Sequence, residues 1–285
     1  MTDMRDPLAV AALQYCAAGS AEETLVTLLP LIERAAGDGA KLICLPEAAT
    51  FLAANRAALD EEAQPMGECT VLDRLRDKAA ALGISLSVGS MFFRGEDGRH
   101  ANRHLLIGND GSVQAEYDKI HMFDANVGDG KSYRESKYFA PGDRMVMTET
   151  HGIMTGLTIC YDLRFPHLYR RLAQAGAEIL SIPAAFTFNS GKAHWHVLLR
   201  ARAIETGCFV IAAAQCGTHA DGRRTYGHAL IISPWGEIIA EAPTNDANPV
   251  AGANDGIIHA SLDPAAVAKA RAAIPSLGTQ PEFFG

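Results

Sequence analysis

Short apolar runs alternate with helical patterns along the whole chain, and this alternation constrains the fold more than any other feature. Strands are predicted at 8–16, 41–46, 84–92, 104–107, 112–117, 153–160, 178–183, 208–215 and 257–262, and helices at about 20–36, 70–82, 166–175 and 192–206. Turn signals at Asp97-Gly98, Asp110-Gly111 and Ser233–Gly236 add hairpins to these strand–helix units. The mixture predicts an α/β protein in which mixed β-sheets are covered by helices. Without a linker-like composition shift or an internal repeat, we expect one domain over 1–285.

Two helix boundaries are marked by local sequence. Ser20 and Glu23 have the spacing of a capping box, in which each side chain bonds the other residue's backbone N–H, so a helix is predicted to begin there. Gly83 follows the amphipathic stretch 70–82 and is typical of a helix C-terminus.

Composition and charge exclude several classes of protein. The chain has 48% hydrophobic and 20% charged residues, and its net charge of −8 argues against a nucleic-acid-binding surface. The acidic N-terminus and its short apolar run do not fit a signal peptide, and the apolar run 208–214 is too short to span a membrane. The six cysteines include no Cys-x-x-Cys pair. We therefore expect a soluble, cytoplasmic protein with reduced thiols and no membrane or nucleic-acid partner.

The segment Gly156–Pro166, GLTICYDLRFP, places Cys160 where an apolar strand ends and a polar turn begins. Pro166 is typical of the first position of a helix. A thiol on such a strand-to-helix turn is exposed at the carboxyl edge of a sheet, close to backbone N–H groups that can hold an oxyanion. Free cysteines are also common packing residues. This segment alone leaves catalysis and packing equally open.

Three charged residues lie in sequence that leaves their role open. Glu47 ends the apolar run 41–46, where an unpaired buried carboxylate is costly and needs a cation or a raised pKa. Lys119 follows a strand-like run among apolar neighbours, although a lysine there can also extend along the surface into solvent. Glu135 lies in a segment without a clear pattern and, taken alone, is interpreted as a solvated surface residue.

A cysteine, a glutamate and a lysine form a chemically sensible set. The thiolate is the nucleophile, so a thiol with a resting pKa of about 8.5 needs a base during attack. A glutamate can take that proton and return it to a leaving amine. A lysine favours the thiolate and stabilises the oxyanion. Glu47, Lys119 and Cys160 each end a predicted strand, and sites form at the carboxyl ends of strands in open α/β sheets.

The same residues resemble the Glu–Lys–Cys triad of the nitrilase (carbon–nitrogen hydrolase) superfamily. They stand in LPEA around Glu47, YDKIHMFD around Lys119 and GLTICYDLRFP around Cys160. Further matching segments are LAQAGAEIL (172–180), AHWHVLLRARAIET (193–206), AAAQCG (212–217), YGHALII (226–232) and PWGE (234–237). The resemblance implies that Glu135 is the superfamily's second glutamate.

The resemblance also implies a fold and a mechanism. The fold is a four-layer αββα sandwich whose protomers form homodimers or higher homo-oligomers. The reaction is amide hydrolysis without a cofactor or metal, in which Cys160 attacks the amide carbon and Glu47 acts as base. Lys119 and the backbone N–H of Tyr161 hold the oxyanion, ammonia leaves, and water activated by Glu47 releases the acid. Glu135 then positions Lys119 or the substrate amide.

Within the superfamily, the chain resembles the amidase branch that contains deaminated glutathione amidase and omega-amidase. The implied substrate is a small amide that bears a carboxylate, and the implied pocket includes Phe186 and His196. His196 stands where these relatives often have glutamate, and the loop 124–130 lacks their usual proline. Arg164 either orders the loop behind Cys160 or meets a substrate carboxylate, and we favour the first role.

The sequence has features of three other functions. A metal hydrolase could use His194 and His196, with His121 and His228, but positions i and i+2 of a helix do not share a face. A non-catalytic assembly module is disfavoured because the triad is intact. A nitrilase, carbamoylase or aliphatic amidase on the same fold stays open, with omega-amidase as the nearest alternative.

Overall fold

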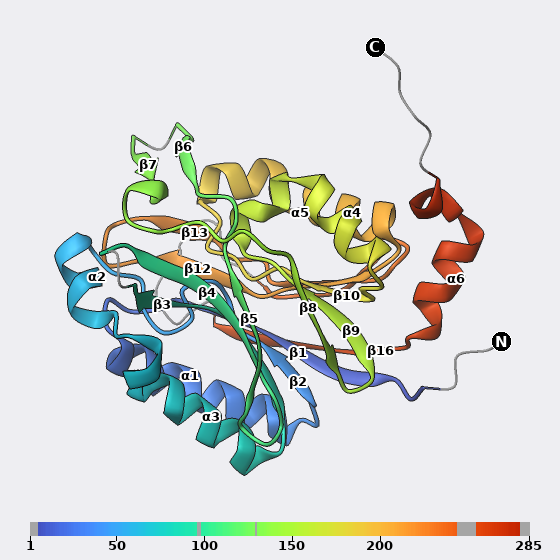
Figure 1. Cartoon of the computed structure of the whole chain (residues 1–285), viewed down its shortest axis with the longest axis horizontal. Helices are drawn as coiled ribbons and strands as arrows, with labels where there is room; N and C mark the ends of the chain where they lie inside the picture. Colours follow the sequence, from blue (N-terminus) through green and yellow to red (C-terminus); the bar gives the residue numbers. More distant parts are fainter. Residues whose placement is uncertain (1–4, 96–97, 129, 244–254, 280–285) are drawn as a thin grey trace.

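Two large mixed β-sheets lie face to face between helices in the computed structural model, which describes residues 5–95, 98–128, 130–243 and 255–279. Figure 1 shows α1 and α3 on the outer side of one sheet and α4 and α5 on the outer side of the other. The layers therefore run helix, sheet, sheet, helix, which confirms the predicted αββα sandwich.

The larger sheet has the strand order β13-β12-β1-β2-β3-β4-β5, and β16 also pairs with β1. Its strands are β1 (Leu8–Tyr15), β2 (Leu42–Cys44), β3 (Ser85–Arg94), β4 (His100–Ile107), β5 (Val113–Asp118), β12 (Ala214–Thr218), β13 (Arg224–Tyr226) and β16 (Gly256–Leu262). The pairs β1–β2 and β2–β3 are parallel, whereas β3–β4, β4–β5 and β1–β16 are antiparallel. The sheet is therefore mixed, as predicted.

The smaller sheet has the order β15-β14-β11-β10-β9-β8. Its strands are β8 (Val146–Thr150), β9 (Ile153–Leu157), β10 (Ile179–Ser181), β11 (Phe209–Ala212), β14 (Leu230–Ile232) and β15 (Ile238–Glu241). The helices are α1 (Ala21–Gly37), α2 (Arg56–Glu62), α3 (Thr70–Leu82), α4 (Pro166–Gln174), α5 (Phe188–Thr206) and α6 (Ala265–Ala273). A separate hairpin joins β6 (Asp124–Asn126) to β7 (Ser132–Arg134).

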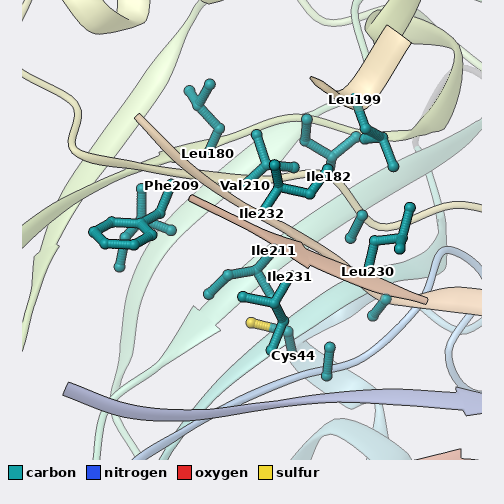
Figure 2. Packing of buried hydrophobic residues seen from close by; sticks show 14 of the residues in the cluster. Cys44, Leu180, Ile182, Leu199, Phe209, Val210, Ile211, Leu230, Ile231 and Ile232 are labelled. Atoms are coloured by element: carbon teal, nitrogen blue, oxygen red, sulfur yellow. The ribbon is translucent and has the colours of Figure 1, made fainter. Parts of the chain in front are cut away.

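Strands in the middle of both sheets are buried on both faces, which explains their continuous apolar sequence. In β1, Val10 belongs to the core between the sheets, whereas its neighbour Ala11 packs in the core beneath α1 and α3. Figure 2 shows the same alternation in the smaller sheet, where Ile211 and Ile231 point toward Cys44 of the larger sheet. Cys44 is thus a packing residue between the sheets.

Several predicted boundaries are confirmed and three need correction. Helix α3 ends at Gly83, which has a φ of 62°, and the hairpins at 110–111 and 233–236 form. The predicted turn at 97–98 lies partly outside the described residues, although β3 and β4 pair antiparallel on either side of it. The helix predicted to begin at residue 192 begins at Phe188.

The capping box at Ser20 does not form. Helix α1 begins at Ala21, but the Ser20 side chain makes no capping hydrogen bond. The Glu62 carboxylate, which comes from α2, accepts the Ala21 N–H at 3.0 Å instead. Because a distant residue satisfies this helix terminus, local sequence could not predict the partner.

The strand predicted over 208–215 is two strands in different sheets. β11 belongs to the smaller sheet and β12 to the larger one, and the chain crosses between them at Ala213. All residues from Cys208 to Cys216 are buried. Because both halves are equally apolar, the hydrophobic pattern could not reveal the crossing.

Within the described residues, no helix combines the length and apolar character needed to cross a membrane.

Candidate active site

Cys160 lies on a sharp turn between β9 and α4, as the sequence predicts. It begins a 3₁₀-helix, Cys160–Arg164, and has a φ of 45°, a left-handed conformation that is rare for residues other than glycine. Its N–H donates to the carbonyl oxygen of Pro183 at 2.8 Å. Backbone strain of this kind is common at active sites, where the surrounding structure holds it.

Asp162 and Arg202 hold the turn that carries Cys160. The fully buried Asp162 carboxylate accepts the Tyr117 hydroxyl at 2.7 Å and the N–H and Nδ1 of His121 at 3.1 and 2.6 Å. From α5, the Arg202 guanidinium donates twice to the carbonyl oxygen of Leu163, at 3.0 and 2.9 Å. The position of the thiol is therefore fixed from both sides of the turn.

Glu47 lies on a second tight corner, which follows β2. Its neighbour Ala48 has a φ of 55°, and the Gln215 side-chain amide donates to the carbonyl oxygens of Glu47 and Ala48 at 3.1 and 3.2 Å. Gly89 allows this corner to pack against β3, since a Cβ atom there would lie 2.0 Å from the carbonyl oxygen of Leu45. The corner is thus fixed by a buried amide and a close backbone approach.

Lys119 connects two carboxylates. Its Nζ donates to Oε1 of Glu47 at 2.8 Å and to both oxygens of Glu135 at 3.0 and 2.9 Å. The Asn102 amide donates to the same two carboxylates, at 3.1 Å each. Cys160 lines the same cavity wall as these residues, and its thiol is close enough to feel the charge of Glu47. We call Glu47, Lys119, Glu135 and Cys160 the buried cluster.

The Glu135 carboxylate is not solvated, which corrects the interpretation from its local sequence alone. It lies at the start of a 3₁₀-helix after β7, and its Oε2 accepts the backbone N–H of Phe123 at 2.6 Å. Only 13% of its side chain is exposed. The geometry agrees with the position beside Lys119 that the resemblance implies.

Burial and charge set opposite protonation tendencies within the buried cluster. Burial raises the pKa of the Cys160 thiol well above its usual value, and the Glu47 charge raises it further. Burial would also raise the pKa of Glu47, but the Lys119 charge and three hydrogen bonds hold it below the usual value. Burial would lower the pKa of Lys119, yet the charges of Glu135 and Glu47 raise it. At rest, Cys160 is therefore a thiol, Glu47 a carboxylate and Lys119 an ammonium.

The buried cluster forms part of the wall of a cavity of about 360 Å³. Aromatic rings, three arginines and one aspartate line much of the rest of it: Phe92, Phe123, Tyr133, Tyr138, Phe139, Tyr161, Phe186, Arg56, Arg134, Arg223 and Asp221. The Cys160 side chain borders the cavity while Cys160 as a whole is only 8% exposed. A small molecule with negative charge fits this combination of apolar and basic walls.

Comparison with known proteins identifies the family. The model of the carbon–nitrogen hydrolase family matches residues 9–272. The chain belongs to the carbon–nitrogen hydrolase family. Its relatives include the deaminated glutathione amidase of Mus musculus, 43% identical over 236 residues, which are 81% of this chain and 73% of that protein. The deaminated glutathione amidase of Synechocystis is 39% identical over 281 residues, 95% of this chain and 97% of that protein.

A solved structure agrees with this assignment. The NitFhit protein of Caenorhabditis elegans superimposes with a TM-score of 0.87 at 32% identity, over 97% of this chain. Our chain spans 65% of the length of that chain. The family and the fold together make this protein an amide-hydrolysing enzyme of the nitrilase superfamily.

The carbon–nitrogen hydrolase cavity includes two of the four predicted pocket residues. Tyr161 and Phe186 line it. Arg164 is not among the residues that line the cavity. Its guanidinium carbon lies 5.2 Å from the centre of the Phe186 ring, and its Nη1 lies 3.2 Å from Nδ1 of His194. This position fits the structural role that we favoured for Arg164.

His196 requires a correction, because the described lining of the cavity does not include it. Ser190 of the same helix lines the cavity, and six residues further along, at about 100° per residue, a side chain points roughly 120° away. His196 contacts Glu241 of β15 instead, at 2.9 Å. The described residues of the loop 124–130 are also outside the lining.

Sequence reasoning missed three residues that support the site: Asn102, Asp162 and Gln215. All three are buried. Asn102 and Gln215 are polar residues inside the strands β4 and β12, and Asp162 comes two residues after Cys160. A buried polar side chain in a strand needs a hydrogen-bond partner, so its presence in an apolar run was the available signal.

Proposed function

We propose that this carbon–nitrogen hydrolase cleaves an amide through a thioester on Cys160, with Glu47 as the general base. The convergence of Cys160, Glu47 and Lys119 on one cavity wall carries the proposal, because it places a nucleophile beside a carboxylate that a cation holds ionised. A nucleophile and base within hydrogen-bond reach are the geometric requirement for attack.

The proposed reaction has two halves. Glu47 takes the thiol proton as the Cys160 sulfur bonds to the amide carbon, and the carbonyl oxygen becomes an oxyanion. Glu47 then gives that proton to the amide nitrogen, the C–N bond breaks, and an amine leaves. In the second half, Glu47 takes a proton from water, which attacks the thioester. The acid is released as the proton returns to the Cys160 sulfur.

Lys119 and the backbone N–H of Tyr161 are the proposed donors to the oxyanion. Lys119 is held as a cation by two carboxylates in a low-dielectric site, where a fixed charge acts strongly on developing negative charge. Tyr161 is near the start of a 3₁₀-helix, where N–H groups have no acceptor within the helix. Glu135 positions Lys119 through two hydrogen bonds to its Nζ.

The proposed substrate is deaminated glutathione or a close analogue. The names of the Mus musculus and Synechocystis relatives support this choice. The cavity also offers Arg134 for a carboxylate of such a molecule, together with Arg56 and Arg223, which pair with Asp60 and Asp221. The scissile amide of deaminated glutathione is secondary. Its leaving group is therefore a primary amine rather than the ammonia that we expected from the sequence.

A substrate panel tests this proposal. Purified enzyme is incubated with deaminated glutathione, ω-amides of keto acids, carbamoyl amines and nitriles, and both primary amine and ammonia are measured. We expect the highest kcat/KM with deaminated glutathione and release of a primary amine. A higher kcat/KM with an ω-amide and release of ammonia makes the enzyme an omega-amidase instead.

We also propose a homodimer in a reducing, cytoplasmic compartment. All six cysteines lie within the described residues and are free thiols, which supports a reducing compartment. Exposed apolar side chains support self-association, among them Val197, Ile204, Trp235 and Ile274. The molar mass in solution from light scattering tests the dimer: twice 30.4 kDa is expected, and a monomer contradicts it.

A further inference from the structure

Three side chains outside the catalytic cavity converge at the outer edge of the smaller sheet. They are His196 of α5, His228 just before β14 and Glu241 at the end of β15, and we call them the surface cluster. Oε1 of Glu241 lies 2.9 Å from Nε2 of His196 and 2.7 Å from Nδ1 of His228. The three potential ligand atoms all lie within 4.8 Å of one another.

The backbone and neighbours of His228 hold its ring toward Glu241. His228 has a φ of 55°, and its carbonyl oxygen accepts the indole N–H of Trp195 at 2.8 Å. The Tyr226 ring stacks on the His228 ring at 4.2 Å and 28°. A non-glycine residue in this conformation is strained, and such residues cluster at ligand-binding and active sites. The orientation of the imidazole is therefore built into the fold.

Two imidazoles and a carboxylate are a ligand set that zinc takes in proteins. Ligand atoms about 2.0–2.1 Å from a tetrahedral zinc ion lie roughly 3.3 Å apart, close to the present 2.7 and 2.9 Å separations. The bound ion takes the place of the two contacts that now join the imidazoles to the carboxylate. Small side-chain rotations suffice, and 30% of His196 and 36% of Glu241 are exposed, so water can reach the remaining position.

We propose that His196, His228 and Glu241 form a binding site for a divalent transition-metal ion, with zinc the best match to these ligands. The bound ion cross-links helix α5 to the edge strand β15 and to the turn before β14. This revises our expectation from the sequence, which considered His194 with His196. His194 contacts Arg164 instead, and His196 finds its partners in other elements.

This metal site is separate from the chemistry at Cys160, and the test keeps them apart. The full-length Cys160→Ala protein is used throughout, so that the catalytic thiol cannot bind the metal. After treatment with EDTA and dialysis, the protein is titrated with ZnCl₂ by calorimetry, and bound zinc is measured after gel filtration. We expect one zinc ion per chain and a higher melting temperature with zinc than without it.

Three further variants in the same background decide the site. His196→Gln and His228→Asn each remove one ligand, and asparagine tolerates the positive φ at residue 228. We expect zinc affinity to fall more than about 100-fold, since loss of an outer partner of a metal ligand alone costs 10–100-fold. His259→Gln is the matched control, because His259 also faces a carboxylate, Asp38 at 3.4 Å, but lies outside the surface cluster. Its affinity should equal that of the parent.

The proposal is overturned if the parent binds no zinc, or if His196→Gln binds zinc as the parent does. If circular dichroism shows that His228→Asn is unfolded, Glu241→Gln replaces it. Unchanged affinity in Glu241→Gln then also contradicts a three-ligand site.

Discussion

The buried cluster and the surface cluster both bring together charged residues from separate elements, but they differ in burial. The Lys119 and Glu47 side chains are 2% and 8% exposed, whereas the three side chains of the surface cluster are 16–36% exposed. Burial makes an unpaired charge costly, so every charge in the buried cluster has fixed partners. The buried cluster can support nucleophilic attack, whereas the surface cluster can bind an ion and water.

The largest expected effect comes from removing the nucleophile. Cys160→Ala should lower kcat on the order of 10⁶-fold, as loss of a nucleophile does in other hydrolases. Far-UV circular dichroism and the melting temperature should show that the fold remains. Turnover close to that of the wild type would show that the reaction does not depend on the buried cluster, so that catalysis would no longer distinguish it from the surface cluster.

Removal of the central cation should have the next largest effect. Lys119→Ala should lower kcat by roughly 10²–10³-fold, by analogy with the loss of an oxyanion donor. Lys119 also keeps Glu47 ionised through a 2.8 Å hydrogen bond. Steady-state kinetics test the role of Lys119 as an oxyanion donor, because a change confined to KM is inconsistent with stabilisation of the transition state.

The pH dependence of Lys119→Ala tests how the buried cluster keeps Glu47 ionised. The pKa of Glu47 lies below its usual value because Lys119 and three hydrogen bonds outweigh the effect of burial. The base is therefore ionised at neutral pH, and activity should fall only as the pH drops below the usual carboxyl range. In Lys119→Ala, burial is no longer opposed by this cation, so the acidic limb of kcat/KM should move to higher pH. An unshifted limb would mean that Glu47 is not the base.

Cys44 should give the smallest effect. It lies between the sheets, and burial raises the pKa of its thiol to about 12. Cys44→Ala should leave kcat/KM within about 2-fold and lower the free energy of unfolding by about 1 kcal/mol through a small cavity. Chemical denaturation measures this cost. A loss of activity in a folded Cys44→Ala protein would show that a second thiol takes part.

Local patterns place Glu47, Lys119 and Cys160 at the ends of apolar strands, and strand ends meet at one edge of a sheet, but each pattern alone leaves the role of its residue open. Glu135 has no such signal and was placed only by the resemblance to a family. Gln215 could not be predicted, because its amide acts on a corner 168 residues away in the sequence. His196 was placed wrongly for the same reason, since its partner Glu241 is 45 residues away.

A covalent intermediate on Cys160 is the central claim, and peptide mapping after rapid quenching tests it most directly. Enzyme and deaminated glutathione are mixed, quenched in acid through the first turnover, digested and analysed by mass spectrometry. We predict that the peptide containing Cys160 gains the mass of the acyl part of the substrate, and that Cys160→Ala shows no such gain. Turnover without any adduct, or an adduct on a peptide that lacks Cys160, would contradict the account.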